Sequence, residues 1–359
     1  MTRVLIMAGG TGGHVFPALA VADELRSRSV EVEWIGTERG IESRLVPAAQ
    51  IKLNLIPIKG LRGNGALGWL VAPFRILRAV LASRKIIQRF QPNMVIGLGG
   101  FASGPGGLAA WLSGKPLVIH EQNAIAGLTN RLLARIAKRV LQGFDNSFTS
   151  NDKTLWVGNP VRQAIEQLPL PETRYQSRTA KPVKLLVLGG SLGARTLNQL
   201  VPQALALLKQ SFTVEVMHQC GEKHLADCRL AYQQAGVPAT VSAFIDDMAQ
   251  TYAEADLVIC RAGALTVAEV AAAGVAAIFV PYPYAVDDHQ TYNAQALKDA
   301  GAALLFADAE LTAEQLASTF SSLLADRTQL ENMAKKAKKL AKPGSAKQIA
   351  DICLEVANG

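Results

Sequence analysis

Short apolar runs alternate with longer segments of helical character along the whole chain. The first run, Val4-Leu5-Ile6, is followed by glycines at 9, 10, 12 and 13 and then by the helix-like segment 16–25. An apolar run that ends at a glycine turn and continues as a helix is typical of a buried strand in an α/β sheet. Further strands are predicted at 30–36, 53–58, 94–98, 116–120, 185–188, 214–218, 240–243, 257–260 and 276–280. The alternation predicts an α/β fold with parallel sheets covered on both faces, while the order of the strands stays open.

The same opening recurs in the second half of the chain, at 184–195, where glycines stand at 189, 190 and 193. For 359 residues, at about 150 residues per domain, two similar Rossmann-like, doubly wound domains are expected. We place them at 1–163 and 164–340, with a C-terminal helix at 341–359 that returns to the N-terminal domain. Segment 168–182, rich in Pro, Glu, Arg and Ser, is predicted to be the linker, and the tail is predicted to form two helices broken at Pro343.

Composition narrows the class of protein. A hydrophobic content of 49% indicates a well-buried globular chain, and no apolar run reaches the roughly 18 residues of a spanning helix. Because the first residues lead directly into a core strand, no cleavable signal is predicted and a cytoplasmic location is expected. The four cysteines show no Cys-x-x-Cys spacing, so we expect buried, reduced thiols rather than metal or redox chemistry. The net charge of +8 favours an anionic partner, which could be nucleic acid, an acidic membrane or a phosphorylated substrate.

The first glycine turn can present backbone N–H groups at a helix N-terminus, which favours phosphate. The dinucleotide fingerprint fails, because Gly10 and Gly12 are followed by Val15 at the third glycine position. No P-loop pattern occurs either, and a nicotinamide dehydrogenase remains only as an alternative. His14 directly follows the turn, where it could act as a general base or serve as an ordinary hydrogen-bonding residue.

Two stretches of the second half could bind a nucleotide. Ser191 could cap a helix whose free amides suit a diphosphate, or belong to an ordinary capped turn. Glu269, one turn into a helix that opens at Gly263-Ala264, could hold ribose hydroxyls or simply face solvent. Asp287, Asp288 and His289 are consecutive and do not converge on one ion, so no metal site is predicted.

A helix-like stretch over 67–89 mixes apolar and basic residues. It could be a core helix with a solvated basic face. Alternatively, it could be an interfacial patch that inserts Trp69, Leu70 and Phe74 into lipid while Arg75 and Arg78 meet anionic headgroups. Both interpretations can hold for different residues of the same helix.

Six motifs, taken together and in order, resemble the MurG family of bacterial cell-wall glycosyltransferases. They are Gly9–His14, His120-Glu121-Gln122-Asn123, Gly158–Arg162, Gly189–Ala194, Arg261–Glu269, and His289-Gln290 with Asn293-Ala294. The resemblance implies a GT-B fold, with two domains facing a cleft. It also implies inverting transfer of N-acetylglucosamine from UDP-N-acetylglucosamine to the 4-hydroxyl of lipid I, an undecaprenyl-diphospho-N-acetylmuramoyl-pentapeptide. No metal and no cofactor is implied, since the UDP-sugar is a substrate.

The resemblance also implies roles for individual residues. Donor contacts would come from Thr11, Gly12, Gly13, Asn123, Arg162, Ser191, Ile245, Ala264, Leu265, Thr266, Val267, Ala268, Glu269 and Gln290. Ser191 and Arg162 would stabilise the leaving UDP, and Glu269 would hold ribose. Ile245 would offer backbone groups to uracil, and Gln290 with Asn123 would orient sugar hydroxyls. His14 is the candidate base for the acceptor hydroxyl, with Glu121 as the second candidate.

The chain departs from the family pattern at Leu192, where Gln is frequent, and at His289, where some members have a second Gln. A lipid-linked acceptor shifts the interpretation of the basic helix toward docking on an anionic membrane, so we expect a peripheral protein on the cytoplasmic face. Two alternatives remain. The chain could be another GT-B transferase with a lipid acceptor, such as diacylglycerol, or a non-catalytic protein that binds a nucleotide sugar or nucleic acid. No aromatic-basic RNA motif supports nucleic acid as the partner.

Overall fold

The computed structural model describes residues 1–58, 65–179, 181–190 and 193–359, with the side chains of 65–70 and 286 left out. The chain forms two compact units: Met1–Val161 with Gly344–Gly359, here called unit 1, and Arg162–Pro343, here called unit 2. Their bounds differ from the expected 163 and 340 by two and three residues. Both units are parallel α/β sheets, so the predicted fold class is confirmed.

Within its described residues, unit 1 has a seven-stranded sheet of order β3-β2-β1-β4-β5-β6-β7, and every neighbouring pair is parallel. Its strands are β1 (Arg3–Met7), β2 (Glu31–Gly36), β3 (Lys52–Leu55), β4 (Met94–Gly97), β5 (Leu117–Glu121), β6 (Arg139–Gln142) and β7 (Thr154–Trp156). Its helices are α1 (Gly12–Ser27), α2 (Glu42–Ala48), α3 (Gly65–Phe90), α4 (Ser103–Leu112), α5 (Leu128–Leu133) and α15 (Ser345–Asn358).

The side chains of β1 explain why this sheet is covered on both faces. Val4 and Ile6 belong to a core shared with α1 and α15, whereas Leu5 and Met7 belong to a core shared with α3, α4 and α5. A strand buried on both sides is apolar throughout, which is the pattern that predicted it. β1 lies between β2 and β4 in the sheet, so the loops after β1 and β4 meet where the connections diverge, the usual place for ligands in such folds.

Unit 2 repeats the arrangement with a six-stranded parallel sheet of order β10-β9-β8-β11-β12-β13 among its described residues. Its strands are β8 (Val183–Leu188), β9 (Val214–Gln219), β10 (Thr240–Ser242), β11 (Leu257–Cys260), β12 (Ala276–Phe279) and β13 (Ala303–Leu305). Its helices are α6 (Gln163–Glu166), α7 (Pro171–Gln176), α8 (Arg195–Leu208), α9 (Leu225–Ala235), α10 (Met248–Glu254), α11 (Ala264–Ala273), α12 (His289–Asp299), α13 (Ala313–Ala325) and α14 (Arg327–Lys339), with short 3-10 turns at Glu222–His224 and Val286–Asp288.

All ten predicted strands are confirmed, although β3 ends at Leu55 rather than 58. Three short strands, β6, β7 and β13, were not predicted. The break between α14 and α15 at Pro343 is confirmed. The four cysteines are buried and free, as expected. Across the described residues, none of the helices combines the length and apolar character needed to span a bilayer.

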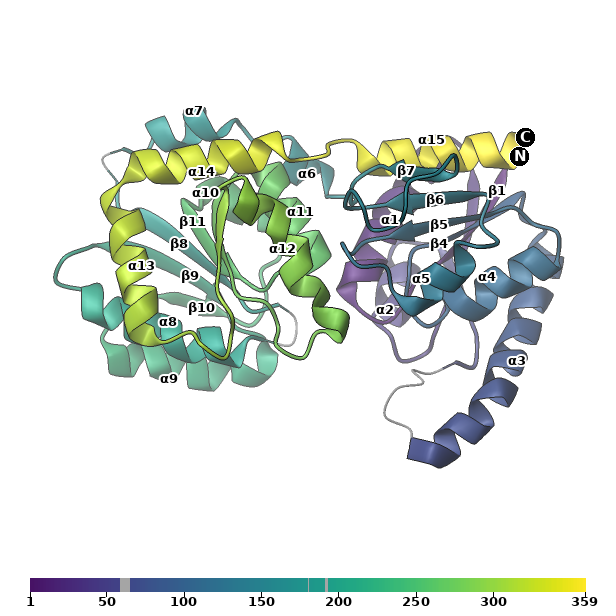
Figure 1. The fold of residues 1–359 in the computed structure, drawn as a ribbon, viewed down its shortest axis with the longest axis horizontal. Coiled ribbons are helices and arrows are strands. Elements are labelled where there is room, and N and C mark those ends of the chain that lie inside the picture. The colour runs from purple at the N-terminus through teal and green to yellow at the C-terminus, as the bar shows by residue number, and fades with distance from the viewer. Residues whose placement is uncertain (59–64, 180, 191–192) are drawn as a thin grey trace. The chain divides into compact units, whose positions relative to one another are not determined.

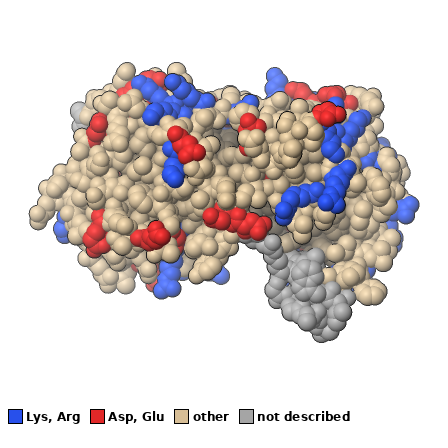
Figure 2. Space-filling model, in the orientation of Figure 1, with Lys and Arg blue, Asp and Glu red and all other residues tan. Residues whose placement is uncertain are grey.

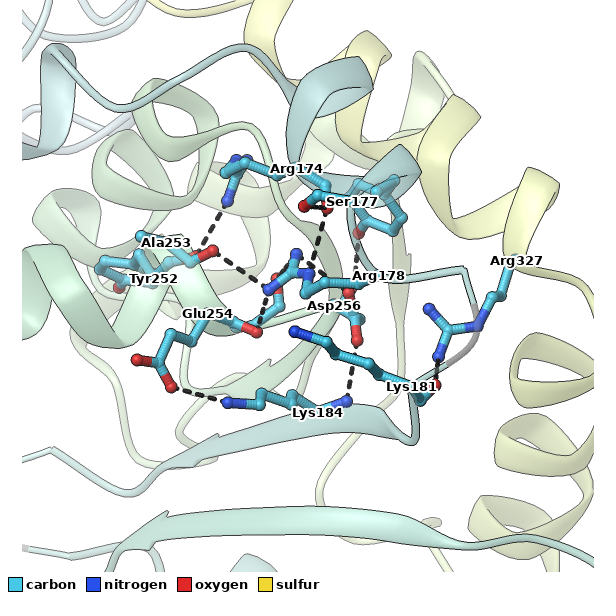
Figure 3. Close-up of polar contacts among 12 residues, drawn as sticks. Arg174, Ser177, Arg178, Lys181, Lys184, Tyr252, Ala253, Glu254, Asp256 and Arg327 are labelled. Carbon is cyan, nitrogen blue, oxygen red and sulfur yellow. Dashed lines mark hydrogen bonds and ion pairs between the residues drawn. The ribbon is translucent and has the colours of Figure 1, made fainter.

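The predicted linker is wrong, because the described part of 168–182 is packed into unit 2. Arg174 is buried and donates to the carbonyls of Tyr252, Ala273 and Gly274. Arg178 forms an ion pair with the buried Asp256 at 3.0 Å. Figure 3 shows both arginines directed at the C-terminal end of α10 and the strand that follows it. The charged residues of this segment predicted a solvated linker. Instead, the guanidinium groups of its arginines donate to main-chain carbonyls inside the unit.

Candidate active site

The first glycine turn connects β1 to α1 and is tied to a buried carboxylate. Gly10 has φ +94°, a conformation suited to glycine, and its amide donates to Glu42 Oε2 at 2.9 Å. Glu42 is fully buried and its Oε1 accepts from the amide and hydroxyl of Thr37. Thr11 is the exposed N-cap residue of α1, and Gly12 and Gly13 begin the helix. The turn therefore has a carboxylate beneath it, an unfavourable environment for a diphosphate.

His14 lies at the start of α1 and is joined to the end of β5. Its Nδ1 is 3.0 Å from Gln122 Oε1. Gly99, which follows β4, lies against the imidazole: a Cβ built there would be 2.4 Å from Nδ1. The structure thus brings His14 and the 120–123 motif together and leaves the imidazole half-buried.

Glu121, the second base candidate, organises the loop that follows it. Its Oε1 accepts from the amide and side chain of Asn123 at 3.0 and 3.2 Å. Its Oε2 accepts from the amide of Gly127 and the side chain of Asn130 at 3.1 and 2.9 Å. Four hydrogen bonds and a buried position commit both oxygens to the loop, which argues against Glu121 as the base and in favour of His14.

The second glycine turn connects β8 to α8, and here the group beneath the turn is neutral. The amide of Gly190 donates to Gln219 Oε1 at 3.1 Å, and Gln219 Nε2 donates to the Gly190 carbonyl at 2.9 Å. Ser191, assigned to the donor site, lies outside the described residues, as does Leu192. An amide beneath the turn leaves it without the negative charge found in unit 1.

The helix α11 presents its first turn toward the end of β11. Gly263 is its extended N-cap residue and provides no side-chain cap. Ala264 is buried, and Leu265, Thr266 and Ala268 are half-buried, so the first-turn amides can serve an anion. Val267, also in the predicted set, is buried, and its amide donates to Gly263 O at 2.9 Å.

Arg162 and Glu269, to which the resemblance gave separate roles, contact each other. Arg162 Nη2 lies 2.9 Å from Glu269 Oε1, and Tyr252 donates to Glu269 Oε2 at 3.4 Å. Glu269 is 7% exposed, so it does not face solvent. Burial raises the pKa of the Glu269 carboxyl above its ordinary value, while Arg162 opposes the shift. Half of the Arg162 side chain remains exposed, so its guanidinium can still meet an anion.

The remaining donor candidates of unit 2 are Gln290, in the first turn of α12, and Ile245, in the loop after β10. Gln290 Oε1 accepts from the amides of Ala262 and Tyr282 at 3.2 and 2.9 Å, which leaves Nε2 as the group that can donate to a sugar hydroxyl. Asn293, which carried no assigned role, is buried and donates to Ala262 O at 3.1 Å. Ile245 is buried just after β10. Among the described residues, no group of three or more His, Cys, Asp or Glu could hold a metal.

The two predictions for α3, a core helix and an exposed apolar and basic surface, apply to different parts of the helix. Its C-terminal half enters the core through Ala79, Ile86, Ile87 and Phe90. Further toward its start, Phe74 is 70% and Leu77 is 55% exposed, and Arg75 and Arg78 are exposed beside them. The side chains of Trp69 and Leu70 lie outside the described residues. α3 therefore is both a core helix and the carrier of an exposed apolar and basic surface.

Comparison with known proteins extends over both units. The glycosyltransferase family 28 N-terminal domain matches residues 4–142, and the family 28 C-terminal domain matches residues 184–349. The chain is 56% identical over 358 residues, 99% of each protein, to the UDP-N-acetylglucosamine--N-acetylmuramyl-(pentapeptide) pyrophosphoryl-undecaprenol N-acetylglucosamine transferase of Cellvibrio japonicus. It is 48% identical over 353 residues, 98% of each, to the enzyme of the same name from Coxiella burnetii.

Solved structures agree with these matches. The crystal structure of Acinetobacter baumannii MurG superposes with a TM-score of 0.86 at 42% identity, covering 99% of this chain and 100% of that one. The UDP-GlcNAc 2-epimerase from Neisseria meningitidis, at 13% identity and a TM-score of 0.68, shares the fold. The chain shares more than half of its residues with a full-length relative, matches both family 28 domains and has two parallel-sheet units of GT-B type. It therefore belongs to the MurG family of glycosyltransferases.

Proposed function

We propose that this protein transfers N-acetylglucosamine from UDP-N-acetylglucosamine to the 4-hydroxyl of the N-acetylmuramoyl unit of lipid I, giving lipid II in peptidoglycan synthesis. The observation that carries the proposal is the 56% identity, over 358 residues, to a relative named for this transfer. The named relatives extend over both units, so the donor domain and the acceptor domain are each represented.

Most of the proposed donor contacts come from unit 2, and Asn123 of unit 1 is added to them. The first-turn amides of α11 and the second glycine turn would hold the diphosphate, with the Ser191 hydroxyl added to them. Arg162 would supply positive charge as UDP departs, and its ion pair with Glu269 orients the guanidinium. Glu269 would share its carboxylate with ribose hydroxyls. Ile245 would meet uracil through its backbone, and Gln290 Nε2 and Asn123 would orient the sugar.

The proposed acceptor site lies in unit 1 and centres on His14. In a single in-line displacement, the acceptor 4-hydroxyl gives its proton to His14 and its oxygen bonds to the anomeric carbon. The bond from that carbon to the diphosphate breaks, and UDP leaves with the electron pair, which inverts the anomeric configuration. Thr11, Gly12 and Gly13 border the reacting sugar at the same helix start. A neutral imidazole with a lone pair is what the first part of this step requires.

Association with an anionic membrane surface, on the cytoplasmic face, is proposed for unit 1. Besides the exposed face of α3, α4 contributes Trp111 and Leu112, each 52% exposed, and α5 contributes the exposed Leu132. Figure 2 shows Lys and Arg side chains grouped over the part of unit 1 where Figure 1 draws α4 and α5. Apolar side chains bordered by basic ones suit the interface of a bilayer that carries an undecaprenyl-linked substrate.

The test is a transfer assay with radiolabelled UDP-N-acetylglucosamine and a lipid I analogue. We expect label to enter the lipid product, with UDP formed in equal amount. An active relative run in the same assay shows that the acceptor is competent. No transfer by this protein under conditions where the relative is active contradicts the proposal. Titration with UDP and with an oligonucleotide separates a nucleotide-sugar site from nucleic-acid binding.

A further inference from the structure

A chain of four hydrogen-bonding groups runs from the backbone of unit 1 to His14. It begins at the Gly158 carbonyl, which is 2.9 Å from Nε2 of His120. A carbonyl oxygen only accepts, so Nε2 of His120 carries the hydrogen. His120 is fully buried, and burial lowers its pKa to about 4, which keeps the ring neutral near pH 7. A neutral ring with hydrogen on Nε2 has its lone pair on Nδ1.

The orientation of the Gln122 amide follows from two acceptors on one side of it. Gln122 Nε2 lies 2.9 Å from the Leu98 carbonyl oxygen and 3.0 Å from Nδ1 of His120. Both partners accept, and the amide nitrogen has two hydrogens to give. The Leu98 contact alone fixes the orientation, because the opposite one would place Oε1 against a carbonyl oxygen. Gln122 is 2% exposed, so water does not offer it an alternative partner.

With its nitrogen committed, Gln122 presents Oε1 to His14. Oε1 is 3.0 Å from His14 Nδ1, and an amide oxygen only accepts, so Nδ1 of a neutral His14 carries the hydrogen. The lone pair of His14 is then on Nε2, the nitrogen on the other side of the ring. Gly99 holds the ring from the backbone side: its φ is +91° and a Cβ there would collide with Nδ1 at 2.4 Å.

We propose that Gln122 is a positioning residue that fixes His14 in the Nδ1–H tautomer, so that Nε2 faces the acceptor hydroxyl as a lone-pair base. His120 and the Leu98 carbonyl orient the amide, and the Gly158 carbonyl orients His120. The catalytic part of this inference rests on the proposed function, whereas the tautomer is a property of the protein alone. A histidine without such a partner exchanges between two tautomers, and only one of them places a base at Nε2.

The same hydrogen bonds would also satisfy buried polar groups if they had only a structural role. The test must therefore observe the tautomer of His14 directly. The chain has five histidines, few enough for assignment by long-range proton–nitrogen NMR of ¹⁵N-histidine-labelled protein, with His14→Gln and His120→Gln identifying their signals. In the neutral rings we expect hydrogen on Nδ1 of His14 and on Nε2 of His120. A wild-type His14 signal showing hydrogen on Nε2 overturns the proposal without any assay of activity.

Kinetics then test whether the tautomer matters. Gln122→Met removes the acceptor for His14 and should lower kcat by about 10- to 100-fold, within the ~10²–10⁴ that a general base contributes, with unchanged UDP affinity. Gln122→Glu keeps an oxygen acceptor for Nδ1–H, so it should retain more turnover than Gln122→Met. A Gln122→Met enzyme with wild-type kcat overturns the positioning role.

The outcomes also separate this inference from the proposed function. The wild-type protein could transfer no sugar to lipid I while its NMR signals show the expected tautomers. That result would contradict the proposed function and support the proposed orientation of Gln122 and His14. If the protein transfers sugar and His14→Gln retains wild-type turnover, His14 is not the base and the catalytic part of the inference is overturned. If Gln122→Met loses UDP binding as well, the variant is misfolded and the wild-type tautomer decides.

Discussion

The two glycine turns begin with the same local structure but differ in the group beneath them. In unit 1 the amide of Gly10 donates to the buried carboxylate of Glu42, and in unit 2 the amide of Gly190 donates to the side-chain amide of Gln219. A carboxylate repels a phosphate placed above it, whereas an amide does not. A strand–glycine–helix opening is therefore not by itself a phosphate site. We propose that the charge of the side chain below each turn decides its role, with the acceptor at the first turn and the diphosphate at the second.

Replacing His14 should lower turnover more than any other change, because we assign this residue to the transfer step and not to nucleotide binding. His14→Gln keeps a side chain of similar size but removes the base, so kcat should fall by about 10²–10⁴-fold. UDP affinity, measured by isothermal titration, should stay within about twofold of wild type. A large loss of UDP affinity would place His14 in the donor site and would break the division between the two turns.

Glu269 should behave in the opposite way. Glu269→Ala removes the partner of Arg162 and of Tyr252 and should weaken UDP binding by about 10- to 100-fold, the cost of losing hydrogen bonds to charged groups. Turnover at saturating donor should change less than affinity does. The matched control is Glu269→Gln, which keeps a hydrogen-bonding side chain without the charge. Equal losses of kcat in Glu269→Ala and His14→Gln would contradict the assignment of separate roles.

Exchanging the groups beneath the turns tests the comparison directly. Gln219→Glu places a carboxylate under the second turn and should weaken UDP binding by roughly 10-fold through like-charge repulsion. The reciprocal Glu42→Gln should leave UDP affinity unchanged. It should still lower the stability of the protein by about 1–3 kcal/mol, since an amide nitrogen cannot accept from Gly10 or Thr37. Thermal melts of both variants separate folding from binding.

Each unit also buries a neutral histidine, which predicts a common response to acid. Burial lowers the pKa of His120 to about 4 and that of His218 to about 3, from an ordinary 6.5. Below pH 6.5 the unfolded chain binds protons that the folded chain does not, so stability falls as pH falls. His120 alone should cost about 2 kcal/mol between pH 6.5 and 5. Denaturant unfolding of His120→Gln should show a shallower pH dependence than wild type; an identical slope would refute this.

The smallest expected effect concerns the membrane surface of unit 1. Replacing Phe74 and Leu77 together by Ser should weaken binding to anionic vesicles by about 3- to 10-fold, because apolar area is lost from the interface. The control is Leu207→Ser, which alters a similarly exposed leucine in unit 2. UDP affinity should not change in either variant. Equal vesicle binding by the double variant and the control would remove α3 from the docking surface.

The strands were predictable because both sheets are covered on both faces, which makes their central strands apolar throughout. The missed strands are short: β6 has polar residues at both ends, Arg139 and Gln142, and β7 and β13 have three residues each. The failed linker has a different cause. Arg174 and Arg178 belong to a residue type that is usually exposed. Their partners in the interior are main-chain carbonyls and the Asp256 carboxylate, which lie 75 to 100 residues further along the chain. No local pattern contains that information.

The motifs of the candidate site were predictable from the sequence, but the hydrogen bonds within the site were not. His14 and the 120–123 motif are recognisable in the sequence, and the structure joins them. The sequence does not indicate that both carboxylate oxygens of Glu121 accept hydrogen bonds from the loop that follows. Nor does it indicate that Gln122 presents its side-chain oxygen to His14. Both depend on the conformation of the β5 end and on carbonyls at Leu98 and Gly158. Glu42 was also missed, since nothing near it in the sequence marks a buried acid.

The helix α15 has a consequence for how the protein is made. Its residues Ile349, Ile352, Cys353 and Val356 belong to the core that α1 and β1 share, although unit 2 separates them from the rest of unit 1 in the chain. During synthesis, the ribosome releases unit 2 before this last helix. Unit 1 therefore begins first but completes its core last, and its half-covered sheet must stay soluble while all of 162–343 is translated. A nascent chain would therefore complete unit 2, the proposed donor-binding unit, before unit 1.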